Sequence, residues 1–385
     1  MTVTNLRVGA FEAVVLGSGP SGSAAAAELA RRGLRTALIG RSGLQRPNIG
    51  ECLPPGIRPQ LEKAGVWEEF LYAGHTPSVG IRSVWGSSDP VDRDFLLSPY
   101  MDGWHIDRAR FDAMMHNAAR RSGATWLNCM ALREIERIAE GWRIKLAMDS
   151  GDCHIEARLV IDATGRASVF ARRAGAKRNY LDRLAGVAGY FTSRETPLSI
   201  EPVLLVEAVE NGWWYTAPLP EGKLIAVFMT DADIIQNQKL TQADQWMTLL
   251  GSTLHQSRRV KEFGLQWDGA IRVVQAESSF LDRIAGDGWL AAGDAAAAFD
   301  PLSSQGLIAA ISSGLDAGQT AADWLHGDDR APVAYAERAR RGCAEYLTRR
   351  GIYYRMEMSW PERSFWKMRH TSHVALSPGR KAVCV

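Results

Sequence analysis

Little in this sequence points to a nucleic-acid or membrane partner, or to an oxidising compartment. The five cysteines are scattered and form no C-x-x-C pair, which argues against a zinc knuckle or a dithiol redox centre and favours a reducing cytoplasm. The formal net charge is only +2, so neither nucleic acid nor a membrane surface is an expected partner. No apolar run reaches the ~20 residues that span a bilayer, and the N-terminus has no apolar stretch typical of a secretion signal.

Several catalytic signatures are missing as well. The chain contains no H-E-x-x-H zinc motif and no G-x-S-x-G nucleophile elbow, so neither a metalloprotease nor a serine hydrolase is indicated, and we expect no metal site. What is present is an ordinary globular composition of 385 residues, 46% hydrophobic and 23% charged. This length allows one large domain or two to three smaller ones.

The first part of the chain is typical of a nucleotide-binding unit. Residues 13–17 (AVVLG) are apolar, as in a buried parallel strand, and the alanine-rich residues 21–32 predict a helix. Gly33 is expected to end that helix, and residues 35–39 predict a second strand. The order is that of a β–α–β unit.

Three glycines in the loop GSGPSG have the spacing G-x-G-x-x-G. Gly17 permits the tight turn, Gly19 lets the backbone approach a pyrophosphate, and Gly22 allows close packing of helix on strand. The helix N-terminus then offers free N–H groups to the phosphates. We therefore expect a dinucleotide, although the loop alone does not separate NAD from FAD.

The position that should carry an acidic ribose ligand holds Gly40, followed by Arg41. Without a carboxylate, the ribose hydroxyls lose a strong acceptor. Arg41 can instead stack on adenine or pair with a phosphate. On this loop alone the 2′-phosphate of NADP stays an alternative.

The middle of the chain has a different pattern. Residues 185–235 alternate short apolar runs with turns, which predicts an antiparallel sheet. Further helices are expected at about 59–73, 108–122, 240–257, 304–325 and 334–369. A sheet inserted between nucleotide-binding segments creates two layers, and ligands commonly bind in the cleft between such layers.

Two later segments, LVIDATGRAS (159–168) and WLAAGDAAAAFDPLSSQG (289–306), resemble the second and third fingerprints of FAD-dependent aromatic hydroxylases, and HIDRARFD (105–112) supports the likeness. The resemblance implies FAD, with NAD(P)H as a transient electron donor. It also implies an α/β fold: a Rossmann-like FAD-binding domain, an inserted antiparallel β-sheet substrate domain and a C-terminal helical segment. The expected bounds are 11–75, 101–182 and 270–330 for the FAD-binding domain, 76–100 and 183–269 for the substrate domain, and 331–385 for the C-terminal segment.

By the same resemblance, Asp294 binds the ribityl chain of the flavin, and Arg108 reaches its phosphates or ribityl. The turn from Pro301 to Gly306 precedes a predicted helix. Its N–H groups are expected to face the flavin N1–C2=O edge, where negative charge grows on reduction. The full set of expected cofactor-binding residues is Gly17, Gly19, Gly22, Arg41, Arg108, Gly293, Asp294, Pro301, Gln305 and Gly306.

A narrower likeness comes from IGECLPPG (49–56), GWWYTAPLP (212–220), FDPLSSQG (299–306) and the aromatic, basic stretch at 353–370. These segments resemble the branch that holds flavin-dependent tryptophan halogenases. They are more similar to the maturation flavoproteins of tryptophan-derived quinone cofactors. That resemblance implies hydroxylation of a tryptophan side chain in a partner polypeptide through a flavin C4a-hydroperoxide.

Three departures from the halogenases weaken that alternative. Their W-x-W-x-I-P is replaced by WWYTAP at 213–218, their catalytic lysine has no counterpart in GHTPSVGIR (74–82), and Ser303 stands where they carry an acid. Three alternatives to a hydroxylase stay open: a halogenase of tryptophan or indole, a flavin-dependent prenyl reductase, and a flavoprotein that only scaffolds a partner.

Glu51 and Tyr215 are the candidate catalytic residues, because an indole hydroxylase needs a dry pocket and a base for the ring proton. His75, Trp213 and Trp214 are expected to line the substrate pocket by stacking. Alternation along a strand sends neighbouring side chains to opposite faces, so at least one of the two tryptophans should be core. Asp300 is a weaker candidate acid. The C-terminal tail is expected to pack as a helical lid, with protein docking or nucleic-acid binding as alternatives.

Overall fold

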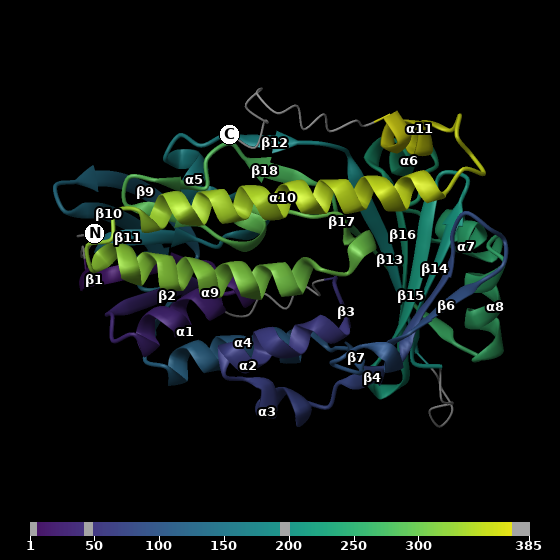
Figure 1. Cartoon of the computed structure of the whole chain (residues 1–385), viewed down its shortest axis with the longest axis horizontal. Coiled ribbons are helices and arrows are strands. Elements are labelled where there is room, and N and C mark those ends of the chain that lie inside the picture. The colour runs from purple at the N-terminus through teal and green to yellow at the C-terminus, as the bar shows by residue number, and fades with distance from the viewer. Residues whose placement is uncertain (1–5, 42–48, 193–200, 372–385) are drawn as a thin grey trace.

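A computed structural model describes residues 6–41, 49–192 and 201–371 of the chain. Within these ranges two large sheets stand side by side, and a long C-terminal helix runs along both (Figure 1). Helices and strands of both kinds interleave along the sequence, so the predicted α/β class is confirmed.

The first large sheet has a parallel centre in the order β20-β11-β1-β2-β8. The β1–α1–β2 unit at its middle follows the pattern predicted from the sequence. Strands β10 and β9 extend the sheet as an antiparallel branch from β11, and β19 pairs antiparallel with β20. The bounds are β1 Leu6–Leu16, β2 Thr36–Gly40, β8 Thr125–Asn128, β9 Ala131–Ile138, β10 Gly141–Met148, β11 Gly151–Asp162, β19 Ala285–Gly286 and β20 Trp289–Ala291.

Helices α1 (Pro20–Arg31), α4 (Arg108–Arg121) and α9 (Gly306–Leu325) pack together at this sheet. The alanine side of α1 makes this close packing possible, because Ala25, Ala26 and Ala27 are buried. A Cβ on Gly314 of α9 would collide with the carbonyl oxygen of Ser21. Small residues on both helices therefore set the distance between α9 and the start of α1.

The second large sheet has the order β17-β13-β16-β15-β14-β5-β6, antiparallel except for the parallel pair β14–β5. Helices α7 (Ala243–Gly251) and α8 (His255–Glu262) flank it on the right of Figure 1. Its bounds are β5 Gly80–Val84, β6 Val91–Asp94, β13 Leu184–Thr192, β14 Val203–Val209, β15 Gly212–Leu219, β16 Lys223–Asp231 and β17 Gln266–Gln275. The division into domains stays a prediction, and β17 runs across its boundary at residue 269.

Two small antiparallel sheets complete the strands, in the orders β3-β7-β4 and β12-β18-β21. Their bounds are β3 Cys52–Leu53, β4 Thr76–Ser78, β7 Gly103–His105, β12 Arg178–Tyr180, β18 Ser279–Leu281 and β21 Ala297–Ala298. The remaining α-helices are α2 Arg58–Ala64, α3 Trp67–Leu71, α5 Val169–Arg173, α6 Ala232–Asn237, α10 Ala331–Met356 and α11 Ser364–Thr371.

The C-terminal tail packs on the body as predicted, but as two helices. Helix α10 passes along α9 and reaches the second large sheet, where α11 folds back against it (Figure 1). Arg369 of α11 is 2% exposed and pairs with both carboxylate oxygens of Asp231, at 3.0 and 2.7 Å. This buried pair ties the end of the chain to β16.

Two predicted helices are also divided. The helix expected at 59–73 breaks at Gly65, whose φ of +72° ends α2 in the left-handed conformation. The helix expected at 240–257 is α7 followed by α8, because the Glu207 side chain accepts the N–H groups of Leu254, His255 and Gln256 and so starts a new helix. No helix in the described ranges is long and apolar enough to cross a membrane.

Candidate FAD site and adjoining substrate face

The three sequence motifs meet at the ends of the parallel strands. A Cβ on Gly17 would collide with the carbonyl oxygen of Ala163 in the second motif, and a Cβ on Gly293 in the third would lie 2.7 Å from the Cβ of Ser21. A Cβ on Gly22 would in turn overlap the carbonyl oxygen of Gly17. Side chains at these glycines would push the three motifs apart, so the glycines allow one shared site.

The start of α1 fits a pyrophosphate. No side chain caps this helix, and no atom lies within 4 Å of a Cβ placed on Gly19. The hydroxyl of Ser21 is buried without a hydrogen-bond partner. Free N–H groups, an unpartnered hydroxyl and open space are what a diphosphate requires at a helix N-terminus.

The Gly40 position is closed to any side chain. A Cβ there would overlap the hydroxyl of Ser18 and lie 2.9 Å from the indole of Trp126 on β8. Arg41 follows on the surface as an exposed residue. The missing carboxylate therefore leaves no empty space, because the Ser18 side chain and the Trp126 ring of the neighbouring strand fill it.

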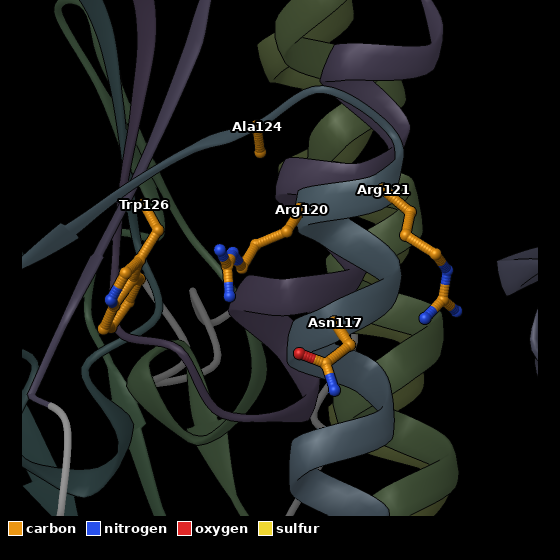
Figure 2. A pocket seen from close by; sticks show the side chains of 5 residues that line it. All are labelled: Asn117, Arg120, Arg121, Ala124 and Trp126. Carbon is orange, nitrogen blue, oxygen red and sulfur yellow. The ribbon is translucent and has the colours of Figure 1, made fainter.

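A hollow of about 580 Å³ lies beside this tryptophan. Figure 2 shows the side chains that line it, from α4 and from the segment that leads into β8. The Arg120 side chain points toward Trp126, while Arg121 points away and pairs with Glu69. None of the predicted site residues lines this hollow; its lining is Asn117, Arg120, Arg121, Ala124 and Trp126.

Asp294 has the position and the freedom expected of a ribityl ligand. Its side chain is 43% exposed, and its ion pair with Arg166 is long at 3.8 Å. Its backbone is held more firmly, because Arg178 donates to the Asp294 carbonyl at 2.5 Å. Gly293 has a φ of +59° and donates its N–H to Ser313 of α9 at 2.8 Å. The turn is thus fixed while the carboxylate stays available.

The turn before α9 is shaped by Asp300 and Ser304. The Asp300 carboxylate accepts the N–H of Leu302 at 2.9 Å, and Ser304 takes a φ of +52°. Helix α9 starts at Gly306 after Gln305 without a side-chain cap, and a Cβ on Gly306 would meet nothing within 4 Å. Pro301 opens a short 3₁₀ turn, Pro301–Ser303. The uncapped N-terminus of this 20-residue helix can stabilise negative charge on a bound flavin.

Arg108 is largely committed within the protein. Its guanidinium donates to the carbonyl of Ile49 at 2.6 Å and contacts Asp112 at 3.3 Å, while Nε is buried without a partner. Arg108 therefore holds the loop that carries Glu51. The unpartnered Nε is the atom left to meet a flavin ligand, and whether it does so stays a prediction.

Glu51 is buried beside this arginine. Its side chain is 4% exposed, one oxygen accepts the N–H of Gly50 at 2.9 Å, and the other oxygen has no partner. Burial raises the pKa of Glu51 to about 7, against the weaker opposing effects of the Gly50 hydrogen bond and the Arg108 charge. Such a carboxyl group can gain or lose a proton near neutral pH.

Tyr215 of β15 lies on the face of the second sheet that approaches Glu51. It belongs to a cluster of buried apolar residues. Ile49, from the loop that carries Glu51, and Leu302, from the turn before α9, pack against this cluster. Burial, together with the negative charge of Glu51, raises the pKa of Tyr215 well above its ordinary value. Tyr215 is therefore a neutral phenol, able to donate a hydrogen bond.

The two tryptophans separate as strand alternation predicts. Trp213 lies on the same face as Tyr215, is 2% exposed, and donates to the Tyr354 hydroxyl at 3.2 Å. Trp214 lies on the opposite face, where it packs against Phe228 and Trp246 at ring-centroid distances of 5.0 and 5.3 Å. Trp214 is not brought together with the other candidates, because its face is covered by α7.

His75 is also apart from this face. Its ring packs on Phe70 at 4.9 Å and near Phe111 at 6.4 Å, and Nδ1 accepts the N–H of Asp107 at 3.4 Å. Burial lowers the pKa of His75 to about 4. It is thus a neutral histidine packed beside α3 and α4, and its place in a substrate pocket stays a prediction.

A group of buried polar residues behind the turn was not singled out as a unit by the sequence. Asp182, Asp300 and Arg350 meet there, with Tyr346 and Tyr354 of α10. Asp300 was considered only as a candidate acid, and its carboxylate is engaged by its neighbours. These residues lie far apart in the sequence, so no local pattern indicates that they meet. The tyrosines in the otherwise basic C-terminal tail are the one visible signal.

Fold and motifs together define an FAD-binding flavoprotein. The sequence pattern of the FAD binding domain family matches residues 10–350, so the chain belongs to this family. It is a flavin-dependent oxidoreductase, as predicted, and FAD is confirmed as the expected cofactor at the level of the family.

The similar proteins include both oxidoreductases and halogenases. LodB of Marinomonas mediterranea, named as an FAD-dependent oxidoreductase, is 28% identical over 94% of this chain and 97% of its own length. The myxobacterial chondrochloren halogenase CndH has a TM-score of 0.83 at 23% identity, over 94% of this chain and 86% of that one. Peptidyl tryptophan dihydroxylase QhpG, essential for tryptophylquinone cofactor biogenesis, has a TM-score of 0.69 at 22% identity, over 93% and 78%.

These two structural likenesses concern the fold. The halogenase overlaps better than the dihydroxylase, contrary to the closer likeness to maturation flavoproteins that the motifs suggested. Flavin-dependent halogenases, a tryptophan 2-halogenase among them, also occur among the curated relatives. The overall backbone is common to both activities, so only individual residues near the flavin can separate them.

Proposed function

We propose that this chain is an FAD-dependent monooxygenase that hydroxylates an aromatic ring. The substrate we propose is a tryptophan side chain of a partner polypeptide during quinone cofactor biogenesis. The motif resemblance and the likeness to QhpG support this substrate, and membership of the FAD binding domain family supports the cofactor. The observation that carries the proposal is Glu51: a buried carboxyl group with one free oxygen, where the flavin-side loop meets the substrate sheet.

Bound FAD, once reduced, would activate molecular oxygen and supply one oxygen atom to the ring, the other leaving as water. The residues proposed to hold it are Asp294 at the ribityl chain, the starts of α1 and α9, and Arg108 through its free Nε. Electrons are proposed to come from NAD(P)H or a separate reductase.

The protein's own part is proton transfer and orientation. As the new C–O bond forms, the displaced ring proton passes to the Glu51 carboxylate. Its pKa of about 7 suits an acceptor that must release the proton again at neutral pH. The neutral Tyr215 phenol orients the indole by a hydrogen bond and by ring contact. Burial of both side chains keeps bulk water from the reacting atoms.

Halogenation is the second candidate, favoured by the overlap with CndH. By the resemblance, a halogenase carries its catalytic lysine in the segment that here reads GHTPSVGIR. Residues 74–82 contain no lysine. Glu51 offers a carboxylate instead, which accepts a ring proton but does not form a haloamine. The chemistry of the residues present therefore favours oxygen transfer.

The test is mass spectrometry of tryptophan-containing partner peptides incubated with the protein, FAD, NADH, ¹⁸O₂ and bromide. We expect a mass gain of one or more ¹⁸O atoms on tryptophan. A bromine isotope pattern would replace this proposal with halogenation. In a separate assay, reduction of a prenyl double bond without oxygen would replace it with a prenyl reductase. Unmodified peptides with no peptide-stimulated oxygen uptake would indicate a scaffold.

A further inference from the structure

A continuous chain of hydrogen bonds joins the substrate sheet to the turn before α9. The indole N–H of Trp213 donates to the Tyr354 hydroxyl at 3.2 Å, and that hydroxyl donates to Oδ2 of Asp300 at 2.6 Å. The other oxygen of Asp300 accepts the backbone N–H of Leu302 at 2.9 Å. Tyr354 thus connects these two parts of the chain by hydrogen bonds on both sides of its hydroxyl.

Charge counting shows why Asp300 depends on this hydroxyl. Arg350 is shared by two buried carboxylates and lies nearer to Asp182, at 2.7 Å, than to Asp300, at 3.3 Å. One cation cannot neutralise two anions, and the Tyr354 hydroxyl makes the shorter contact with Asp300. Without this donor, Asp300 keeps only the Leu302 N–H and the longer Arg350 contact among these partners. Its buried negative charge is then compensated less well.

The surroundings of Tyr354 hold it in one orientation. Its side chain is fully buried, with Arg350 and Arg369 lying 5.1 and 5.3 Å from the ring centroid. Burial and the charge of Asp300 raise the pKa of Tyr354 well above its ordinary value, so the phenol keeps its proton. Tyr354 lies beyond residue 350, where the match to the FAD binding domain family ends.

We propose that Tyr354 is a positioning residue that tunes the bound flavin. Through Asp300 it fixes the turn Pro301–Gly306 and offsets the carboxylate charge behind that turn. This rests on the proposed function, in which the turn lies against the N1–C2=O edge of the flavin. A less well compensated negative charge there disfavours the anionic reduced flavin, so removing the hydroxyl makes the midpoint potential more negative.

The test compares Tyr354→Phe with Tyr335→Phe. Tyr335 is a buried tyrosine on the same helix, but its hydroxyl donates at 2.7 Å to the carbonyl of Ala291 in β20. For Tyr354→Phe we expect a more negative flavin midpoint potential and about tenfold weaker FAD binding, since hydrogen bonds to charged groups contribute about 1.5–3 kcal/mol and each 1.4 kcal/mol is tenfold. Tyr335→Phe should leave both values at those of the parent protein.

Asp300→Asn provides the second arm. Loss of the carboxylate charge should make the potential less negative than in the parent protein, and adding Tyr354→Phe should then cause no further shift, because the two residues act as one unit. This arm decides the question if Tyr354→Phe does not fold. The proposal is overturned if Tyr354→Phe lowers only the unfolding temperature, or if Asp300→Asn leaves the potential unchanged.

Neither readout needs oxygen or an aromatic substrate. A failed hydroxylation assay would leave the potentials as a valid test of Tyr354. Unchanged potentials would overturn the role of Tyr354 but would not affect the outcome of the hydroxylation test.

Discussion

Glu51 is a carboxyl group that the fold removes from water while giving only one of its oxygens a partner. Its pKa is about 7 in the folded chain and 4.5 in its ordinary state. As pH rises from about 4.5 to 7, the unfolded chain releases this proton first. Glu51 therefore lowers the free energy of unfolding across that window, by up to about 3 kcal/mol, and the loss levels off above pH 7.

Glu51→Gln should accordingly stabilise the chain at pH 8 and leave its stability unchanged near pH 4, measured by denaturant unfolding of the flavin-free protein. The same variant should lose the rise in hydroxylation rate that we expect through pH 7 in the parent protein. Equal stabilisation at both pH values would mean that Glu51 is not a buried, proton-exchanging carboxyl group.

At Gly40, one feature of the site could be predicted from the sequence and another could not. The missing carboxylate is visible in the sequence, as is the neighbouring Arg41. The ring that fills the space belongs to Trp126, 86 positions further along the chain, and the two meet because β8 pairs with β2. Only the strand order brings them together, and a single sequence does not contain that order.

Among the elements, α8 depends on a side chain from another strand. Glu207 of β14 is 5% exposed and accepts three N–H groups at the start of α8. Glu207→Gln should destabilise the chain at neutral pH by about 1–3 kcal/mol, because an amide accepts fewer of these bonds and carries no charge toward the helix N-terminus. This is opposite in sign to Glu51→Gln. Stabilisation of the flavin-free chain by Glu207→Gln would contradict the capping role.

Most strands and helices could be predicted because their signals are local. Apolar runs and glycine punctuation predicted α1 and β2 to within a residue, and the end of β1, which begins seven residues before the predicted strand at 13–17. The helix at 240–257 was predicted as one because its break is made by Glu207, a residue outside it. Helix α6 was missed because its six residues, Ala232–Asn237, are too few for a clear helical period.

For the whole molecule, the motifs predicted which segments converge but not how the two sheets meet. Gly17, Ala163 and Gly293 come together as the family resemblance implied. The separation of Trp213 from Trp214 followed from strand alternation. Three other features depend on how distant elements pack, so they could not be predicted from the sequence. They are the place of Trp214 under α7, the place of His75 among phenylalanines, and the contact of Tyr354 with Asp300.

The account as a whole requires that FAD is held where the three motifs meet, with Asp294 on its ribityl chain. The measurement is the flavin content and visible spectrum of Asp294→Ala, beside Asp287→Ala as a control. Asp287 lies seven residues earlier, is exposed, and pairs with Arg137 on the surface. We predict that Asp294→Ala loses bound FAD while Asp287→Ala stays yellow; an unchanged flavin spectrum and FAD affinity in Asp294→Ala would contradict the account.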